Sequence, residues 1–200
     1  MKRAWIGAAC VLIALGAWQS WSQRAVHRAD GVVAPDDPVQ AGFTTTPARV
    51  AMGAFTLSPL ADFKLTARVL SRDDYRFDAG SAISPMDLAV GWGRMSDSAV
   101  LRGLDIDQRD RYYFWRAEAL PIPVREIETH SANMHLIPAD AEVARRLKRI
   151  RAGDLVTLDG WLVEADRPDG WRWRSSLTRD DTGNGACELV YVRDLSIGAR

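Results

Sequence analysis

Apolar and polar residues divide the chain into three parts, of which the first is an apolar run near the N-terminus. Residues 4–18 follow Lys2 and Arg3 and carry no charge, and the next charged residue is Arg24. Tryptophans stand near both ends of the run, where the indole ring favours a membrane interface. The pattern is typical of a short membrane-spanning helix, which needs roughly 17–25 apolar residues.

A cleaved signal peptide is the alternative interpretation of this run. Its best small-x-small cleavage site lies at residues 20–22, where a bulky tryptophan occupies the centre. We therefore predict that residues 1–21 form an uncleaved membrane anchor, with residues 5–21 in the bilayer. The charges before the run favour an inside N-terminus, so we expect the rest of the chain in the periplasm, on a bacterial inner membrane.

The second part, residues 22–50, breaks every regular period with glycine, proline and polar residues. A segment of this composition buries too little apolar surface to order itself, so we predict a flexible tether. The third part, residues 51–200, has the periodicity of a single β-rich soluble domain. With 47% hydrophobic residues over 200 residues, the chain is large enough for one folded core.

Several segments of the third part alternate between apolar and polar residues, as half-buried strands do. These strand candidates are residues 63–69 and 88–92, and an aromatic segment at 112–115 joins them. Between them, Ser96 or Asp97 can cap a short helix.

A longer helix is predicted over residues 138–151. Pro138 suits its first turn, Asp140 and Glu142 favour its positive end, and Gly153 ends it. One face is apolar, and the rest carries five cations: Arg145, Arg146, Lys148, Arg149 and Arg151. This basic face is either solvated and balanced by nearby acids or a contact for anionic lipid or an acidic partner.

The last third of the sequence predicts an antiparallel meander. Residues 155–165 have the pattern of a long strand, whose apolar register shifts by one residue at Gly160, as at a β-bulge. A turn at residues 168–170 and a final strand over 187–195 follow. The elements together predict an α+β, β-rich fold, with a small OB-like or SH3-like antiparallel barrel or meander and one amphipathic helix.

Charge and cysteine content limit the candidate functions. The 26 basic and 26 acidic residues cancel, so we expect no nucleic-acid partner. Cys10 lies in the apolar run and Cys187 in the soluble domain, so we predict no disulfide between them. The neighbouring Glu188 raises the pKa of the Cys187 thiol, which favours a buried small residue over a nucleophile.

Three stretches of the soluble domain resemble a family of uncharacterised bacterial membrane-anchored proteins. They are residues 88–93 (LAVGWG), 131–138 (SANMHLIP) and 181–188 (DTGNGACE). The resemblance covers most of the soluble domain and implies neither an activity nor catalytic residues. If the three stretches converge on one cleft in the folded chain, they indicate a site there.

The strongest candidate for chemistry is the cluster Glu126, Glu128 and His130, followed by His135. In an extended strand the first three side chains share one face, because strand side chains alternate. Two carboxylates and an imidazole suit zinc or another divalent metal, with His135 as a further ligand. The alternative is an exposed polar surface, since the spacing matches no established metal signature.

Trp161, Trp171 and Trp173 are candidates for an aromatic ligand platform. Trp171 and Trp173 share a strand face, and we expect Trp161 opposite them across the hairpin. Such cross-strand aromatic groups either pack in a core or bind a sugar or a peptide.

The sequence contains no recognisable catalytic motif. We therefore expect a membrane-anchored extracytoplasmic binding or assembly module without a cofactor, rather than an enzyme. Two alternatives stay open. One is a metal-dependent hydrolase that uses the Glu/His cluster, and the other is an accessory subunit of a membrane complex with a protein partner in the cell envelope.

Overall fold

The computed structural model describes residues 24–181, 183 and 185–198. The predicted membrane anchor, residues 1–21, lies outside these described residues. Among the residues that are described, no helix has the length and apolar character that a membrane crossing requires.

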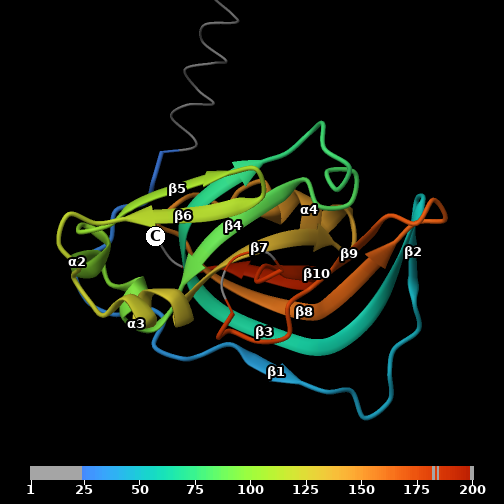
Figure 1. The fold of residues 1–200 in the computed structure, drawn as a ribbon, viewed down its shortest axis with the longest axis horizontal. Helices are drawn as coiled ribbons and strands as arrows, with labels where there is room; N and C mark the ends of the chain where they lie inside the picture. Colours follow the sequence, from blue (N-terminus) through green and yellow to red (C-terminus); the bar gives the residue numbers. More distant parts are fainter. Residues whose placement is uncertain (1–23, 182, 184, 199–200) are drawn as a thin grey trace, which may run out of the picture.

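Five strands form a closed ring at the centre of the molecule (Figure 1). β3 pairs with β4, β4 with β7, β7 with β10, β10 with β8, and β8 pairs again with β3. The ring strands are β3 (Phe55–Asp74), β4 (Met86–Gly91), β7 (Ser131–Pro138), β8 (Leu155–Asp166) and β10 (Glu188–Ile197).

The ring is a mixed sheet, which corrects the prediction of an antiparallel barrel or meander. β7 and β10 run parallel, while the other ring pairings are antiparallel. The chain passes from β7 through the helix α4 (Ala141–Leu147) to β8, and β10 then inserts between these two strands. Local alternation predicts a half-buried strand but does not indicate which strand will lie beside it.

The remaining elements extend or cover the ring. Two short strands, β1 (Val39–Ala41) and β2 (Val50–Met52), pair with β3, and β9 (Arg172–Arg174) pairs with β8. The β4–β7 connection contains a separate hairpin, β5–β6, in which β5 contacts β3 and β6 contacts β7. This connection consists of η1 (Gly93–Ser96), α2 (Ser98–Leu101), β5 (Asp105–Arg109), β6 (Tyr112–Arg116) and α3 (Val124–Thr129).

The main core lies inside the ring, and α4 packs against it. The helix begins at Asp140, whose side chain accepts a hydrogen bond from the Val143 backbone N–H at 2.8 Å. Val143 and Leu147 are buried, so the predicted amphipathic helix is confirmed, although it is shorter than residues 138–151. Alternate residues of the strands fill the ring, among them Phe63, Leu65, Leu88, Val90, Leu136, Leu158 and Val192.

A second, smaller core lies on the outer face of β8. Gly160 itself is paired, with Phe63 of β3 and Val192 of β10, so the predicted bulge does not lie in β8. The register shifts occur in the partner strands, between Pro59 and Ala61 of β3 and between Val192 and Asp194 of β10, and the second shift lies directly opposite Asp159 and Gly160. A side chain at Gly160 would overlap a carbonyl oxygen of β10, so the glycine permits close approach of the two backbones beside this bulge.

The segment that we predicted to be a flexible tether packs along the domain from residue 24 onward. The backbone N–H of Val26 donates to the carbonyl of Ala152 at 2.7 Å, and those of Val33 and Ala34 both donate to the Ser96 hydroxyl at 3.1 Å. β1 then adds to the ring through β3. The composition of this segment predicts how it would behave in isolation. In the folded chain the domain supplies hydrogen-bond partners for the backbone groups of the segment.

Candidate functional site

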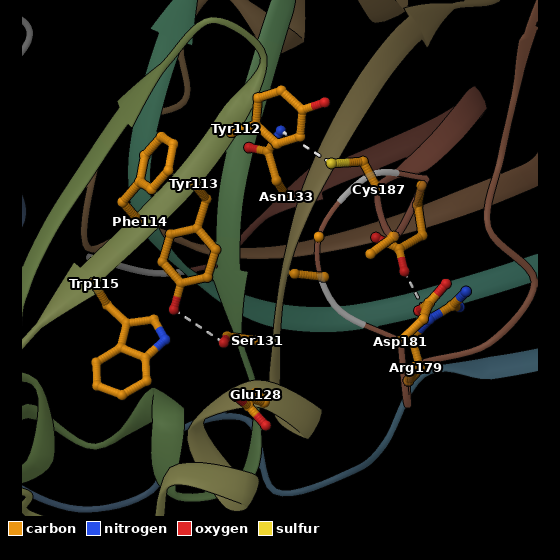
Figure 2. Close-up of a pocket in the computed structure, with 14 residues that line it drawn as sticks. Tyr112, Tyr113, Phe114, Trp115, Glu128, Ser131, Asn133, Arg179, Asp181 and Cys187 are labelled. Carbon is orange, nitrogen blue, oxygen red and sulfur yellow. Dashed lines mark hydrogen bonds and ion pairs between the residues drawn. The ribbon is translucent and has the colours of Figure 1, made fainter.

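A cavity of about 310 Å³ lies between the hairpin strand β6 and the chain that joins β9 to β10 (Figure 2). Its floor includes the start of β7, with Ser131 and Asn133, and the start of β10, with Glu188. Figure 2 shows Tyr113 and Trp115 on one side of this space and Arg179 and Asp181 on the other.

Two of the three stretches that carry the family resemblance meet at this cavity. Residues 131–133 lie at the start of β7, and Asp181, Gly183 and residues 186–188 approach them because β10 runs parallel to β7, with Glu188 opposite Met134. The third stretch, 88–93, includes most of β4, which pairs with β7 on its other side. The tertiary structure thus gathers segments that are separated by up to about fifty residues into one place.

Glu188 is the most unusual residue of the cavity. Its side chain is 1% exposed, and its Oε1 forms an ion pair with Nε of Arg179 at 2.7 Å. Among the residues that the structure describes, its Oε2 has no hydrogen-bond partner. Burial raises the pKa of the Glu188 carboxyl to about 8, and the neighbouring Arg179 opposes this rise. A buried carboxyl oxygen without a hydrogen-bond partner raises the free energy of the folded state. When the group is ionised, this oxygen can accept a hydrogen bond from a ligand.

β6 supplies the aromatic wall. Its side chains alternate, so Tyr113 and Trp115 turn toward the domain while Tyr112 and Phe114 are more exposed. The Tyr113 hydroxyl lies 3.0 Å from the Ser131 hydroxyl, and burial raises the pKa of Tyr113 to about 12. Tyr113 therefore stays a neutral phenol at physiological pH.

Asn133 and Cys187 occupy the upper part of the cavity in Figure 2. The Asn133 amide donates to the carbonyl of Arg111 at 2.9 Å and accepts from Gln108 Nε2 at 2.6 Å, which fixes its orientation. Cys187 is a free cysteine, and burial, with Glu188 beside it, raises its pKa to about 12. The thiol is therefore protonated at neutral pH and is a poor nucleophile.

A second group of polar side chains, Asp87, His135 and Arg111, is largely buried. Asp87 and His135 face each other across β4 and β7, with Asp87 Oδ2 and His135 Nδ1 2.9 Å apart, and both are almost fully buried. Arg111 donates to Asp87 Oδ1 at 2.7 Å and also pairs with Asp78. Trp173 covers His135, with ring centroids 4.5 Å apart. The ion pairs of Arg111 with the buried Asp87 and with the more exposed Asp78 hold the β5–β6 hairpin against the ring.

The predicted Glu/His cluster does not form one group. Residues 124–129 are helical, so the extended strand on which the prediction rested is wrong. Glu126 pairs with Arg94, and Glu128 lies 3.8 Å from Arg125. His130 lies at the C-terminal end of α3, and His135 is buried against Asp87. Within the described part of the chain, no three His, Cys, Asp or Glu side chains are grouped as metal ligands.

The three candidate tryptophans belong to the outer core. Trp161 stacks on Tyr191 at 5.5 Å, and Trp171 contacts Phe55 and Trp173 edge-on. Trp173 lies opposite Ala165 in the β8–β9 pairing, so our placement of Trp161 opposite the other two is wrong. All three are partly buried, and their described contacts favour packing over a free platform.

The basic face of α4 is partly engaged within the domain. Arg145 pairs with Glu142, and Arg146 binds Asp194 and the carbonyl of Leu195 at 2.8 and 2.6 Å. The other cations of the face follow the helix, Lys148 and Arg149 exposed and Arg151 partly buried.

Of the residues that line the cavity, the sequence singled out Glu128 as a candidate metal ligand but did not group the others as a site. Glu188 entered only as a neighbour of Cys187, although a carboxylate directly before the mostly apolar residues 189–192 is a usable signal. Asn133 likewise lies in a strand most of whose residues are apolar. Arg179 gave no local signal, because only the folded loop brings it to Glu188.

Comparisons with known proteins add no further information on this site. No family model matches the chain, and neither a curated protein nor a solved structure matches it.

Proposed function

We propose that this chain is a membrane-anchored binding module of the bacterial cell envelope, and that its ligand binds in the cavity between β6 and β10. The observation that carries the proposal is Glu188, a carboxyl group that is 1% exposed, lines the cavity and has one oxygen without a hydrogen-bond partner in the described part of the chain. Polar groups in this state are uncommon in folded proteins and are often completed by a ligand or water.

The order of the ring strands supports the same proposal. A closed five-stranded ring with one parallel pair is typical of an OB-type barrel, which we infer for this domain. Such barrels bind ligands on the face of their second and third strands and with the loop between the fourth and fifth. The cavity uses the third ring strand, β7, and the connection that leads to the fifth, β10. The barrel alone names no function, so the proposal depends on the cavity.

The dimensions and charge of the cavity narrow the ligand class. A volume of about 310 Å³ accommodates a small molecule or one side chain of a partner protein. Three carboxyl groups, from Glu128, Asp181 and Glu188, line it beside the guanidinium of Arg179. This excess of acid does not suit the phosphate backbone of a nucleic acid.

Residues 1–21 are proposed as the membrane anchor, with the soluble domain in the periplasm of a bacterial inner membrane. Fusing alkaline phosphatase after residue 200 tests the orientation, because this enzyme is active only outside the cytoplasm. The fusion should be active and should stay in the membrane pellet after extraction with alkaline carbonate. An inactive fusion, or release into the supernatant, would contradict the anchor or its orientation.

The binding function is tested with nitrogen-15-labelled full-length chain and four pools of N-acetylated tripeptide amides. The central residue is cationic, anionic, polar or apolar, one class to each pool. At least one pool should shift the indole N–H signal of Trp115. This signal is assigned as the one that is missing from the spectrum of Trp115→Phe. We expect the shift because Trp115 lines the cavity.

A variant that fills the cavity shows whether the shift comes from binding there. Ala132 lines the cavity, so Ala132→Leu should remove the shift. Ala119→Leu makes the same change at an exposed position outside the cavity and should leave the shift intact. The proposal is refuted if neither a tripeptide pool nor a free polyamine such as spermidine shifts the signal, or if Ala132→Leu binds as well as the unchanged protein.

A further inference from the structure

We propose that the ligand of this cavity carries a cationic group, a guanidinium or an ammonium, which Glu188 binds with its unpaired carboxyl oxygen. This inference rests on the function proposed above and names the chemistry of its ligand. Two sources offer that chemistry: an arginine or lysine side chain of a partner protein, and a free polyamine.

The first step of the argument is the hydrogen bonding of Glu188. Arg179 already binds Oε1 at 2.7 Å, while Oε2, in a side chain that is 1% exposed, lacks a hydrogen-bond partner among the described residues. A ligand that completes the ionised carboxylate must donate a hydrogen bond. A charged donor forms a shorter and stronger bond to a carboxylate than a neutral donor does.

The second step is the balance of charge around the cavity. Glu128 on α3 and Asp181 on the β9–β10 connection add two carboxyl groups from different elements. Asp181 accepts a hydrogen bond from Ser176 at 2.7 Å, which positions it without neutralising it. Among the lining residues, Arg179 is the cation and pairs with Glu188, while Arg125, outside the lining, lies 3.8 Å from Glu128. With Glu188 ionised, three carboxylates face these two guanidinium groups, so a ligand cation would meet an excess of negative charge.

The third step is the aromatic wall opposite these acids. Tyr113 and Trp115 line the cavity from β6, across from Arg179 and Asp181 (Figure 2). Cations are attracted to the faces of aromatic rings, and tryptophan gives the strongest attraction. Carboxylates on one side and aromatic rings on the other suit a guanidinium or ammonium group better than they suit an anion.

The acid–base behaviour of Glu188 adds a specific expectation. Burial raises its pKa to about 8, with Arg179 opposing and Asp181 reinforcing the rise. A cation binds the ionised carboxylate, so affinity should increase as pH rises from about 6.5 to about 8.5. Tyr113 and Cys187, whose pKa values are both raised to about 12, stay neutral over this range.

Isothermal titration calorimetry of the full-length chain tests the inference with two matched probes. N-acetyl-Gly-Arg-Gly-amide presents a guanidinium, and the same peptide with citrulline presents a neutral group of nearly the same shape. We expect the citrulline peptide to bind at least about tenfold more weakly, because it loses the charged hydrogen bond. Spermidine, in a third arm, tests the polyamine source, and tighter binding of spermidine than of the arginine peptide assigns the site to polyamines.

Variants show whether Glu188 is the residue that binds the cationic group. Glu188→Gln should lower the affinity for the arginine peptide at least about tenfold and remove the rise of affinity with pH. Glu118→Gln makes the same chemical change at an exposed position outside the cavity and should change neither. Equal affinity for the arginine and citrulline peptides, or an unchanged affinity in Glu188→Gln, overturns the inference. If the cavity binds anionic or apolar tripeptides instead, the cationic ligand is wrong while the binding function stands. If no tripeptide or polyamine binds, both fail.

Discussion

Replacing Glu188 by glutamine should change how the stability of this protein depends on pH. The carboxyl has an ordinary pKa of 4.5, and burial raises the value in the folded chain to about 8. Between these two values the folded state holds one proton more than the unfolded state. Stability from this group is therefore fully present below pH 4.5 and is lost as pH rises toward 8.

The size of the effect follows from the shift. Each unit of pKa corresponds to about 1.4 kcal/mol, so the free energy of unfolding should fall by about 3 kcal/mol between about pH 5 and pH 7.5 through this group alone. That is a large share of the roughly 5–15 kcal/mol that stabilises a typical domain. Glutamine keeps the shape of the side chain but does not titrate.

Urea denaturation of both proteins at several pH values measures the difference directly. We expect the free energy of unfolding of the unchanged protein, minus that of Glu188→Gln, to decrease steadily between about pH 5 and pH 7.5. Taking the difference removes the contribution of every other titrating group that the substitution leaves alone. Glu118→Gln, at an exposed position, provides the control and should give a difference that is nearly independent of pH.

The reasoning fails if the difference is constant over this range. A constant value would mean that Glu188 has an ordinary pKa in the folded chain, and that water or a rearranged loop solvates it. A difference that increases with pH would mean that Arg179 stabilises the carboxylate more than burial destabilises it.

Three further predictions concern the barrel and its buried groups. Gly160→Ala should lower the free energy of unfolding by about 3 kcal/mol in urea denaturation, because the added carbon overlaps a carbonyl oxygen of β10; Gly42→Ala, with open space around it, should have little effect. Asp87→Asn should cost about 3 kcal/mol, because it leaves the buried charge of Arg111 less well paired, and a loss below about 1 kcal/mol would contradict that role. Cys187 should react slowly with a thiol reagent in the folded protein and rapidly after denaturation, when the other cysteine of the chain is replaced by serine; rapid labelling of the folded protein would contradict the pKa of about 12.

The sequence predicted local structure well where one element decides the outcome. Asp97 caps the short helix α2 by accepting a hydrogen bond from Ala99 at 2.8 Å, as its residue type suggested. The amphipathic helix and the strands at 63–69, 88–92 and 112–115 also have local signals, and they form. Local signals failed at residues 126–130, where a polar segment that we took for a strand belongs mostly to the helix α3.

The candidate site was harder to predict, because its residues come from separate parts of the chain. Tyr113, Asn133, Arg179 and Glu188 each lie in a different element or connection. Their proximity depends on the parallel pairing of β7 with β10 and on the β5–β6 hairpin within the β4–β7 connection. Neither feature leaves a periodic signal in the sequence.

By itself, the sequence determined a β-rich domain with one amphipathic helix, because alternation and capping report the burial of each segment. The tertiary structure alone decided that the ring closes with a parallel pair, that the segment after residue 24 packs on the domain, and that Glu188 is buried with a free oxygen. The physical reason is that these outcomes depend on which distant backbone and side-chain groups become neighbours. Pairing between distant segments is set by the whole fold and not by the local pattern of apolar residues.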